Sequence, residues 1–238
     1  MPRKLRFGGR EVKPDTRYLY DMEEVVYDKK WLENAENVPL YFMYRGLYKP
    51  GDRETIVENN LRYDITVIPA RMLGEEYVKT KGHYHPKANE MTYPELYGVL
   101  EGRAHYLLQK RTDGGVSRTV LVEAEEGDMV IIPPGYGHIT INPSKEDLKM
   151  ANWVCRDFDS IYEPILERKG GAWFELEDEF VKNENYEDVP ELERFKASKN
   201  DPFDGDIYDL IETSEKLKFL TDPGDSIDLF RNLEFFKL

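Results

Sequence analysis

The stretch from Gly127 to Asn142, GDMVIIPPGYGHITIN, decides the expected fold. A glycine opens it after a tight turn, the apolar run MVII follows, and Pro133-Pro134-Gly135 ends that run with a rigid bend. His138 follows on the next expected strand, where its side chain should point inward. The spacing G-x5-P-x-G-x2-H-x3-N therefore predicts two short strands that present one histidine at a defined place.

A second informative stretch lies upstream, TKGHYHPKANEMTYPELYGVLEG at residues 80–102. His83 and His85 are two residues apart, so on a strand their imidazoles project from the same face. A metal ion needs this geometry from two neighbouring ligands. Farther along, Glu95 begins the pattern E-x6-G, in which a strand-like run ends at a turn at Gly102.

The chain around these two motifs, from residue 39 to 166, consists of short β-branched and aromatic runs separated by turn clusters. The runs are PLYFMYRGLY (39–48), LRYDITVIPA (61–70), LYGVLEG (96–102), AHYLLQK (104–110), RTVLVEAEEG (118–127), DMVIIPPG (128–135) and MANWVC (150–155). Asp113-Gly114-Gly115 and Glu126-Gly127-Asp128 supply turns between them. Short strands at such spacing predict an all-β sandwich or barrel.

The two ends of the chain differ from this central part. Residues 21–34, DMEEVVYDKKWLEN, have the N-cap and mixed helical spacing of a short helix. Residues 172–190 can add a last strand or hairpin. Beyond Pro190 the chain is acidic and has helix-like spacing in DIYDLIETSEKLKFL (206–220). We therefore expect one domain over residues 1–190 and an acidic, helical C-terminal appendage over 191–238.

Composition narrows the classes of function. The 238 residues carry a formal net charge of −14, which disfavours non-specific binding to nucleic acid or to anionic lipid. Cys155 is the only cysteine, so no intrachain disulfide is expected, and its apolar surroundings favour a buried thiol. The N-terminal residues have no apolar stretch behind their basic residues, which predicts a cytoplasmic protein.

Together the two motifs are similar to the signature motifs of the cupin superfamily, and the chain most closely resembles the archaeal-type, metal-dependent phosphoglucose isomerases. The resemblance rests on TKGHYH, ELYGVLEG and PPGYGHITIN, and also on DMEEVVYDKKW and YEPILERKG. It covers roughly residues 15–190. It implies a cupin double-stranded β-helix, a jelly-roll barrel, with a short N-terminal helix before it and the helical appendage after it.

The resemblance implies a divalent metal held by three histidines and one glutamate, and His83, His85, Glu95 and His138 occupy the matching positions. Imidazole and carboxylate ligands suit iron, manganese, nickel or zinc, of which we expect iron. Glu95 and His138 are the expected catalytic residues, with Glu95 both a ligand and a proton-transferring base.

The spacing departs from that of the resembled family in one place. Glu95 stands ten residues after His85, whereas the family places the carboxylate about seven after, and Glu90 in the spacer PKANEMTYP is a rival. Prolines and an asparagine near Glu90 suit a loop. We prefer Glu95, because it starts an alternating run and is followed by Tyr97, as in the E-x-Y of the family.

The resemblance also implies a pocket of hydroxyl groups and backbone amides for a sugar phosphate. The expected substrate-binding residues are Tyr41, Thr66, Thr80, Gly82, Tyr97 and Tyr162. Lys81 can meet the phosphate or turn to solvent, and His105 belongs to neither motif. A histidine that the family carries shortly before the position of Tyr162 is absent from the run RDFDSIY.

The implied function is interconversion of glucose 6-phosphate and fructose 6-phosphate, a step of glycolysis and gluconeogenesis. The expected partner is a small sugar phosphate, with no nucleic acid and no membrane, and the expected assembly is a homodimer. Two alternatives stay open: another cupin metalloenzyme, such as a dioxygenase or a different sugar-phosphate isomerase, and a non-catalytic sugar-binding cupin.

Overall fold

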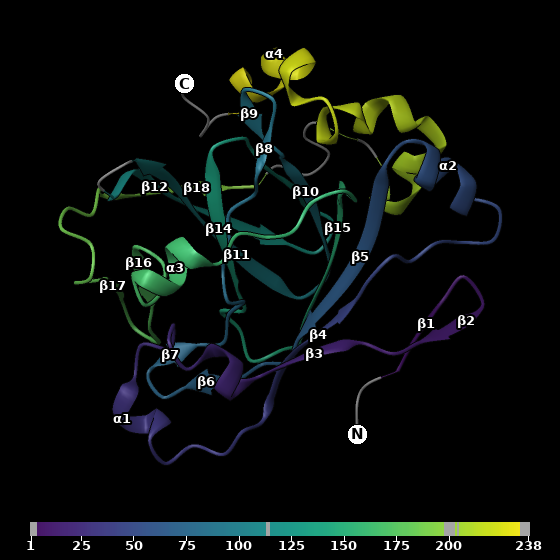
Figure 1. Ribbon diagram of the computed structural model, residues 1–238. Helices are drawn as coiled ribbons and strands as arrows, with labels where there is room; N and C mark the ends of the chain where they lie inside the picture. The colour runs from purple at the N-terminus through teal and green to yellow at the C-terminus, as the bar shows by residue number, and fades with distance from the viewer. Residues whose placement is uncertain (1–3, 113–114, 198–202, 204, 234–238) are drawn as a thin grey trace.

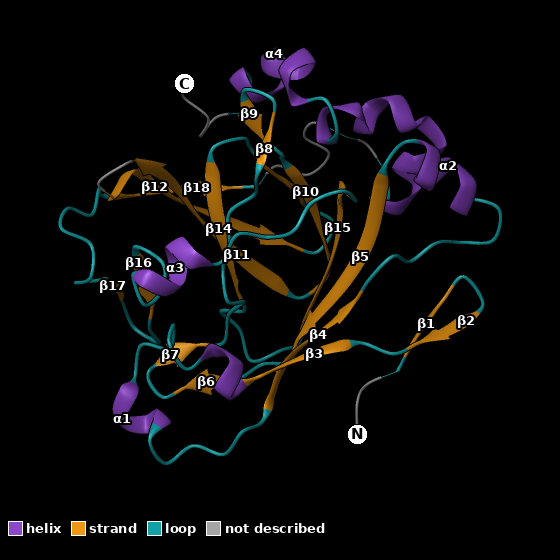
Figure 2. Cartoon of the chain, viewed as in Figure 1, coloured by secondary structure: helices purple, strands orange, loops and turns teal. Residues whose placement is uncertain are grey.

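The computed structural model describes residues 4–112, 115–197, 203 and 205–233, and strands dominate it (Figures 1 and 2). One sheet has six strands, in the spatial order β13 (Met129–Ile132), β10 (Glu95–Glu101), β15 (Leu148–Cys155), β5 (Leu61–Ile68), β4 (Pro39–Tyr44) and β3 (Asp15–Tyr18). A second has four, in the order β14 (Tyr136–Ile141), β11 (Arg103–Thr112), β12 (Gly115–Glu125) and β18 (Leu192–Lys196). The expectation of an all-β fold is confirmed.

Smaller elements complete the described chain. Four two-stranded pairs are β1 (Leu5–Phe7) with β2 (Arg10–Val12), β6 (Met72–Leu73) with β7 (Glu76–Tyr77), β8 (Lys87–Ala88) with β9 (Met91–Thr92), and β16 (Trp173–Glu175) with β17 (Phe180–Lys182). The helices are η1 (Leu19–Met22), α1 (Lys29–Leu32), α2 (Arg53–Glu58), α3 (Glu163–Glu167), η2 (Tyr208–Leu220), η3 (Pro223–Ser226) and α4 (Ile227–Arg231). None of these helices is long and apolar enough to cross a membrane.

Each apolar run named from the sequence contains a strand of one of the two large sheets. The hairpin after Gly171 is also present, as β16 and β17. β11 and β12 pair up to Thr112 and Gly115, while residues 113 and 114 of the predicted turn lie outside the described residues. Glu126-Gly127-Asp128 joins β12 to β13, and Gly127 has a φ of 90°, which only glycine adopts readily.

The expected helix over residues 21–34 is replaced by two short helices, η1 and α1. Asp28 stands between them, and its carboxylate accepts a hydrogen bond from the backbone N–H of Trp31, 2.9 Å away. This bond caps a new helix start, so the chain cannot continue as one helix through that residue. Val25 and Val26, in the link, are buried in the core.

The segment 191–238 begins with a strand that the sequence analysis did not predict. β18 pairs in parallel with β12, from Thr119 opposite Leu192 to Glu123 opposite Lys196. Farther on, the expected helical part is present as η2, η3 and α4, of which η2 lies beside α2 (Figure 1). η2 is a 3-10 helix interrupted at Thr213, and η3 starts at Pro223, where the sequence predicted a break.

The strands that form the wall of the site are buried on both faces. On β5, Tyr63 points outward to the C-terminal segment, while its neighbours Arg62 and Asp64 line a pocket on the other face. On β15, the indole N–H of Trp153 donates to the carbonyl of Ile207, 2.7 Å away. The C-terminal segment therefore covers the back of the strands whose inner faces carry polar side chains.

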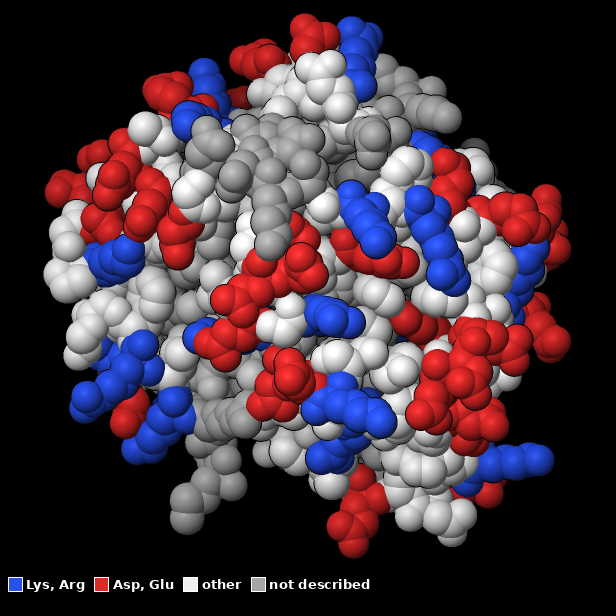
Figure 3. All heavy atoms as spheres, turned by 180° about the vertical axis from the view of Figure 1, so that it is seen from behind, with Lys and Arg blue, Asp and Glu red and all other residues white. Residues whose placement is uncertain are grey.

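The acidic composition is visible on the surface. On the face shown in Figure 3, acidic side chains gather in several groups, with basic side chains interspersed among them. No broad basic area is visible among the described residues of that face. This distribution agrees with the net charge of −14.

Candidate metal centre and substrate pocket

The two sequence motifs meet through backbone pairing. The segment with Thr80 and His83 lies along β14, where Thr80 N–H donates to Thr140 O at 2.8 Å and His83 and His138 form an antiparallel bridge. This pairing places the two imidazole rings 4.4 Å apart between centroids. Backbone hydrogen bonds thereby hold the two motifs next to each other, with their histidines close together.

Gly82 permits this close pairing. Its φ is 78°, and a Cβ placed on it would lie 2.5 Å from Cγ1 of Ile139 on β14. That distance is far below van der Waals contact, and the backbone conformation is one that L-residues rarely adopt. A glycine is therefore required where the segment lies against β14.

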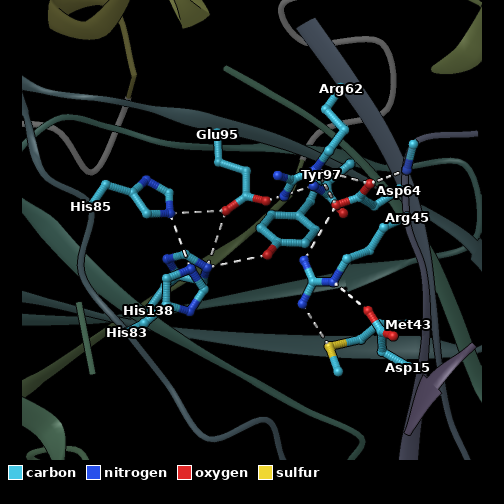
Figure 4. Close-up of polar contacts among 12 residues, drawn as sticks. Asp15, Met43, Arg45, Arg62, Asp64, His83, His85, Glu95, Tyr97 and His138 are labelled. Carbon is cyan, nitrogen blue, oxygen red and sulfur yellow. Dashed lines mark hydrogen bonds and ion pairs between the residues drawn. The ribbon is translucent and has the colours of Figure 1, made fainter. Parts of the chain in front are cut away.

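Glu95 enters the cluster from the opposite sheet, as the first residue of β10. One ligand atom from each of His83, His85, Glu95 and His138 lies within 4.8 Å of the others. Oε2 of Glu95 is 3.3 Å from Nε2 of His85 and 3.3 Å from Nε2 of His138, and the Nε2 atoms of His83 and His85 are 3.1 Å apart. Figure 4 shows these side chains converging on one point.

Neighbouring groups fix the orientation of the cluster. Nδ1 of His85 donates to the carbonyl of Tyr93, 2.8 Å away, so that its Nε2 keeps a free lone pair in the neutral ring. The phenolic oxygen of Tyr97 lies 3.2 Å from Nε2 of His138. The amide of Asn152 donates to Oε1 of Glu95 at 2.7 Å.

The electrostatics of the cluster suit a cation. Burial lowers the pKa of His83 well below its ordinary value and lowers the pKa of His138 to about 4, so both rings are neutral near pH 7. Burial alone would raise the pKa of Glu95, but the electrostatic interactions with the nearby imidazoles of His85 and His138 bring it below its ordinary value. The result is one carboxylate beside the neutral imidazoles of His83 and His138.

Two buried atoms of the cluster have no hydrogen-bond partner within the described chain, namely Oε2 of Glu95 and Nδ1 of His138. A buried carboxylate oxygen without a partner is costly, and a bound cation would compensate for it. The donor set, three imidazoles and one carboxylate, is one that divalent transition metals favour. The residues present therefore fit a divalent metal ion.

The rival carboxylate lies elsewhere. Glu90 is exposed in the turn between β8 and β9, where Asn89 has a positive φ of 60°. Its side chain is absent from the group of possible metal ligands among the described residues. The longer spacer of this chain thus forms a small hairpin at the surface, and Glu95 is the carboxylate beside the histidines.

All expected substrate-binding residues line one pocket beside the cluster: Tyr41, Thr66, Thr80, Gly82, Tyr97 and Tyr162. The hydroxyl of Thr80 accepts from the backbone N–H of Thr140 at 3.0 Å, which leaves its own hydrogen free to donate. Lys81 also lines the pocket, and its backbone N–H donates to the hydroxyl of Tyr41 at 3.3 Å. Neutral donors of this kind can surround a phosphate group.

The pocket also holds charged residues that the sequence analysis did not name. Asp64 is buried, and both of its oxygens accept from Nε of Arg62, at 2.9 and 3.1 Å. Arg45, which directly follows β4, has Nη1 3.6 Å from the same carboxylate. Arg62 and Asp64 stand four and two residues before Thr66 on β5, and residues at a spacing of two share one face of a strand. The sequence therefore held a signal that these two residues lie in the pocket with Thr66.

Other candidates fall outside the cluster. His105 lies away from it and pairs with Glu175, its Nδ1 2.8 Å from the carboxylate. Cys155 is buried, as expected. Ser160 lines the pocket two residues before Tyr162, in the run where the resembled family carries a histidine, and Phe158 lies against His85 with ring centroids 4.6 Å apart.

Comparisons with known proteins agree with this geometry. The family model of glucose-6-phosphate isomerase matches residues 15–191. The glucose-6-phosphate isomerase of Thermococcus litoralis is 34% identical over 134 residues, which are 55% of this chain and 63% of that protein. That of Pyrococcus abyssi is 30% identical over 155 residues, 64% of this chain and 75% of that protein.

The likeness to solved structures is weak. The oxalate decarboxylase from Bacillus subtilis is 17% identical to this chain, and the match covers 51% of this chain and 27% of that one with a TM-score of 0.36. The matched stretch of the first sequence relative spans less than two thirds of that relative.

Proposed function

The chain belongs to the glucose-6-phosphate isomerase family, and we propose that it interconverts glucose 6-phosphate and fructose 6-phosphate with the help of a divalent metal ion. The observation that carries the proposal is the convergence of His83, His85, Glu95 and His138 beside a pocket lined by hydroxyl groups. These four residues are the proposed metal ligands.

The reaction moves a hydrogen between C1 and C2 of the open-chain sugar. A metal bound at the cluster supplies a Lewis acid that stabilises negative charge on the oxygens of these carbons. Glu95 is the proposed base, because it lines the pocket within the cluster, whereas the other pocket carboxylate, Asp64, is paired with Arg62. His138, held next to Tyr97 and Glu95, is the second proposed catalytic residue.

The phosphate group of the sugar is proposed to lie on the hydroxyl side of the pocket. Thr66, Thr80 and the backbone N–H of Gly82 are the proposed donors, with Tyr41 and Tyr162 beside them. Holding the phosphate there orients the carbon chain toward the histidines and Tyr97. Binding energy at this remote group then serves to place C1 and C2 near Glu95.

The finer assignments are also proposals. Iron is the proposed metal, since imidazole and carboxylate ligands suit it, with manganese, nickel or zinc as substitutes. A homodimer is the proposed assembly, supported by the outer edge of β3, which pairs with no further strand of the described chain, and by the exposed rings of Tyr18 and Tyr20. The proposed setting is the cytoplasm, in glycolysis or gluconeogenesis, where sugar phosphates of this kind are converted.

The experiment is metal analysis of the purified protein, followed by a coupled assay of fructose 6-phosphate conversion with and without a chelator. Chelation should abolish isomerisation, and an added divalent ion should restore it. Full activity in a verified metal-free preparation would exclude the metal-dependent mechanism. Metal binding without any isomerisation would instead favour another metalloenzyme or a non-catalytic sugar-binding protein.

A further inference from the structure

The two carboxylate oxygens of Glu95 have different surroundings. Oε1 accepts a hydrogen bond from Nδ2 of Asn152 at 2.7 Å. Oε2 has no hydrogen-bond partner within the described chain and lies 3.3 Å from Nε2 of both His85 and His138. One oxygen is therefore engaged by the protein, and the other is directed at the imidazole nitrogens.

Strand register brings Asn152 to this place. On β15, Asn152 is opposite Tyr97 of β10 on one side and opposite Asp64 of β5 on the other, while Glu95 is opposite Val154. Its side chain therefore projects from the same face as Glu95, one step along the strand. The residue is buried, with 5% of its surface exposed, within the otherwise apolar run MANWVC.

A buried amide at this position needs a specific partner. An unpaired buried amide costs free energy, and an apolar side chain would pack there without that cost. The other polar neighbour, Asp64, already accepts hydrogen bonds from Arg62 and from the backbone N–H of Gly46. The amide of Asn152 is thus matched to Glu95.

We propose that Asn152 is a positioning residue that holds Oε1 of Glu95 so that Oε2 alone is directed at the metal site. The proposal rests on the proposed function, because it takes Glu95 as a ligand. Without the amide, Oε1 loses its buried donor, and the carboxylate can turn away from the three imidazoles. Groups that orient metal ligands in this way typically contribute 10- to 100-fold to metal affinity.

The test compares Zn²⁺ affinities, measured by competition with a chromogenic chelator, for the full chain and for Asn152→Leu. The substitution keeps the number and branching of the side-chain heavy atoms and removes the amide. We expect the Zn²⁺ affinity to fall about 10- to 100-fold. The kcat of the enzyme should fall with it, while the KM for fructose 6-phosphate should change little, because the proposed phosphate donors are untouched.

A double-mutant cycle separates positioning from a general disturbance of the pocket. In a Glu95→Gln background, Asn152→Leu should change the Zn²⁺ affinity by about twofold at most, because the interaction it removes is already altered. An equal loss of affinity in both backgrounds would overturn the proposal. So would an Asn152→Leu protein that binds Zn²⁺ as tightly as the parent.

Asn183 offers a matched control. It is also a buried asparagine, and its amide donates to the carbonyls of Arg168 and Gly171, away from the cluster. Asn183→Leu should lower the unfolding temperature but leave Zn²⁺ affinity unchanged. If Asn152→Leu does not fold, Asn152→Ser takes its place, since its hydroxyl is too short to reach Glu95, and the same loss of affinity is expected.

The outcomes distinguish this proposal from the proposed function. A parent protein that binds no divalent metal contradicts the proposed function itself. A parent that binds Zn²⁺ and isomerises fructose 6-phosphate, together with Asn152 variants of unchanged affinity, contradicts only the positioning role.

Discussion

His83 and His138 each donate a backbone hydrogen bond to the other's carbonyl, at 3.2 Å for His83 N–H and 3.0 Å for His138 N–H. These residues lie in different sequence motifs, yet the bridge places their rings side by side. These backbone bonds set the spacing from which the two imidazoles start, whether or not an ion is bound.

The first prediction concerns the two carboxylates of the first motif. Glu95→Gln should lower turnover by at least about 100-fold, the usual contribution of a general base, and should also weaken metal binding. Glu90→Gln should behave like the parent, because Glu90 is exposed in the turn between β8 and β9. Bound metal and kcat are measured for both variants. The reverse ranking would assign the ligand to Glu90 and contradict the strand register at β10.

A second prediction tests the phosphate side of the pocket. Thr80→Val removes a hydroxyl that faces the pocket, and a hydrogen bond to a charged group contributes about 1.5 to 3 kcal/mol. We expect fructose 6-phosphate to bind roughly 10- to 100-fold more weakly, with the metal content unchanged. Thr119→Val is the control, since Thr119 is a buried threonine outside the pocket. Unchanged substrate binding would remove Thr80 from the site.

A third prediction concerns the contact between Gly82 and β14. Gly82→Ala forces a Cβ to within 2.5 Å of Ile139 at a φ of 78°. We expect a loss of about 2 to 5 kcal/mol of stability, from the backbone conformation and the overpacking together, and weaker metal binding as His83 moves from His138. Gly224→Ala is the control, because nothing lies within 4 Å of a Cβ there. Thermal unfolding and chelator competition measure both effects, and two indistinguishable variants would refute the argument.

The last prediction concerns the C-terminal segment. The hydroxyl of Tyr208 accepts from the backbone N–H of Lys49 at 2.6 Å and donates to Asp52 at 2.7 Å. Tyr208→Phe should cost about 1 to 3 kcal/mol and lower the Tm by about 2 to 10 °C, while kcat stays unchanged because the residue lies behind the pocket wall. Tyr27→Phe, at an exposed position, should leave the Tm as it is. A loss of kcat at a temperature where the variant is folded would show that this segment acts on the site.

The sequence by itself determined most strands of the two sheets, though not β3 or β18, and the members of the cluster. Alternation of β-branched and aromatic residues is a local property, so it predicts each strand without knowledge of its partners. The sequence also predicted Glu95 rather than Glu90 as the carboxylate of the cluster, because only Glu95 begins an alternating run. The pocket residues Thr66, Thr80 and Gly82 followed from the resemblance.

Other features were decided only by the tertiary structure. β18 has a largely polar sequence, LERFK, so its local signal is weak, and its pairing with β12 is seen only in the structure. The partnership of Asn152 with Glu95, and that of Arg45 with Asp64, depends on which residues face each other across neighbouring strands. Register joins residues far apart in the chain, and a shift of one residue would turn each of these side chains to the opposite face. The sequence shows which residues of a buried strand are polar, but the residues that they contact depend on how the strands pair in the sheet.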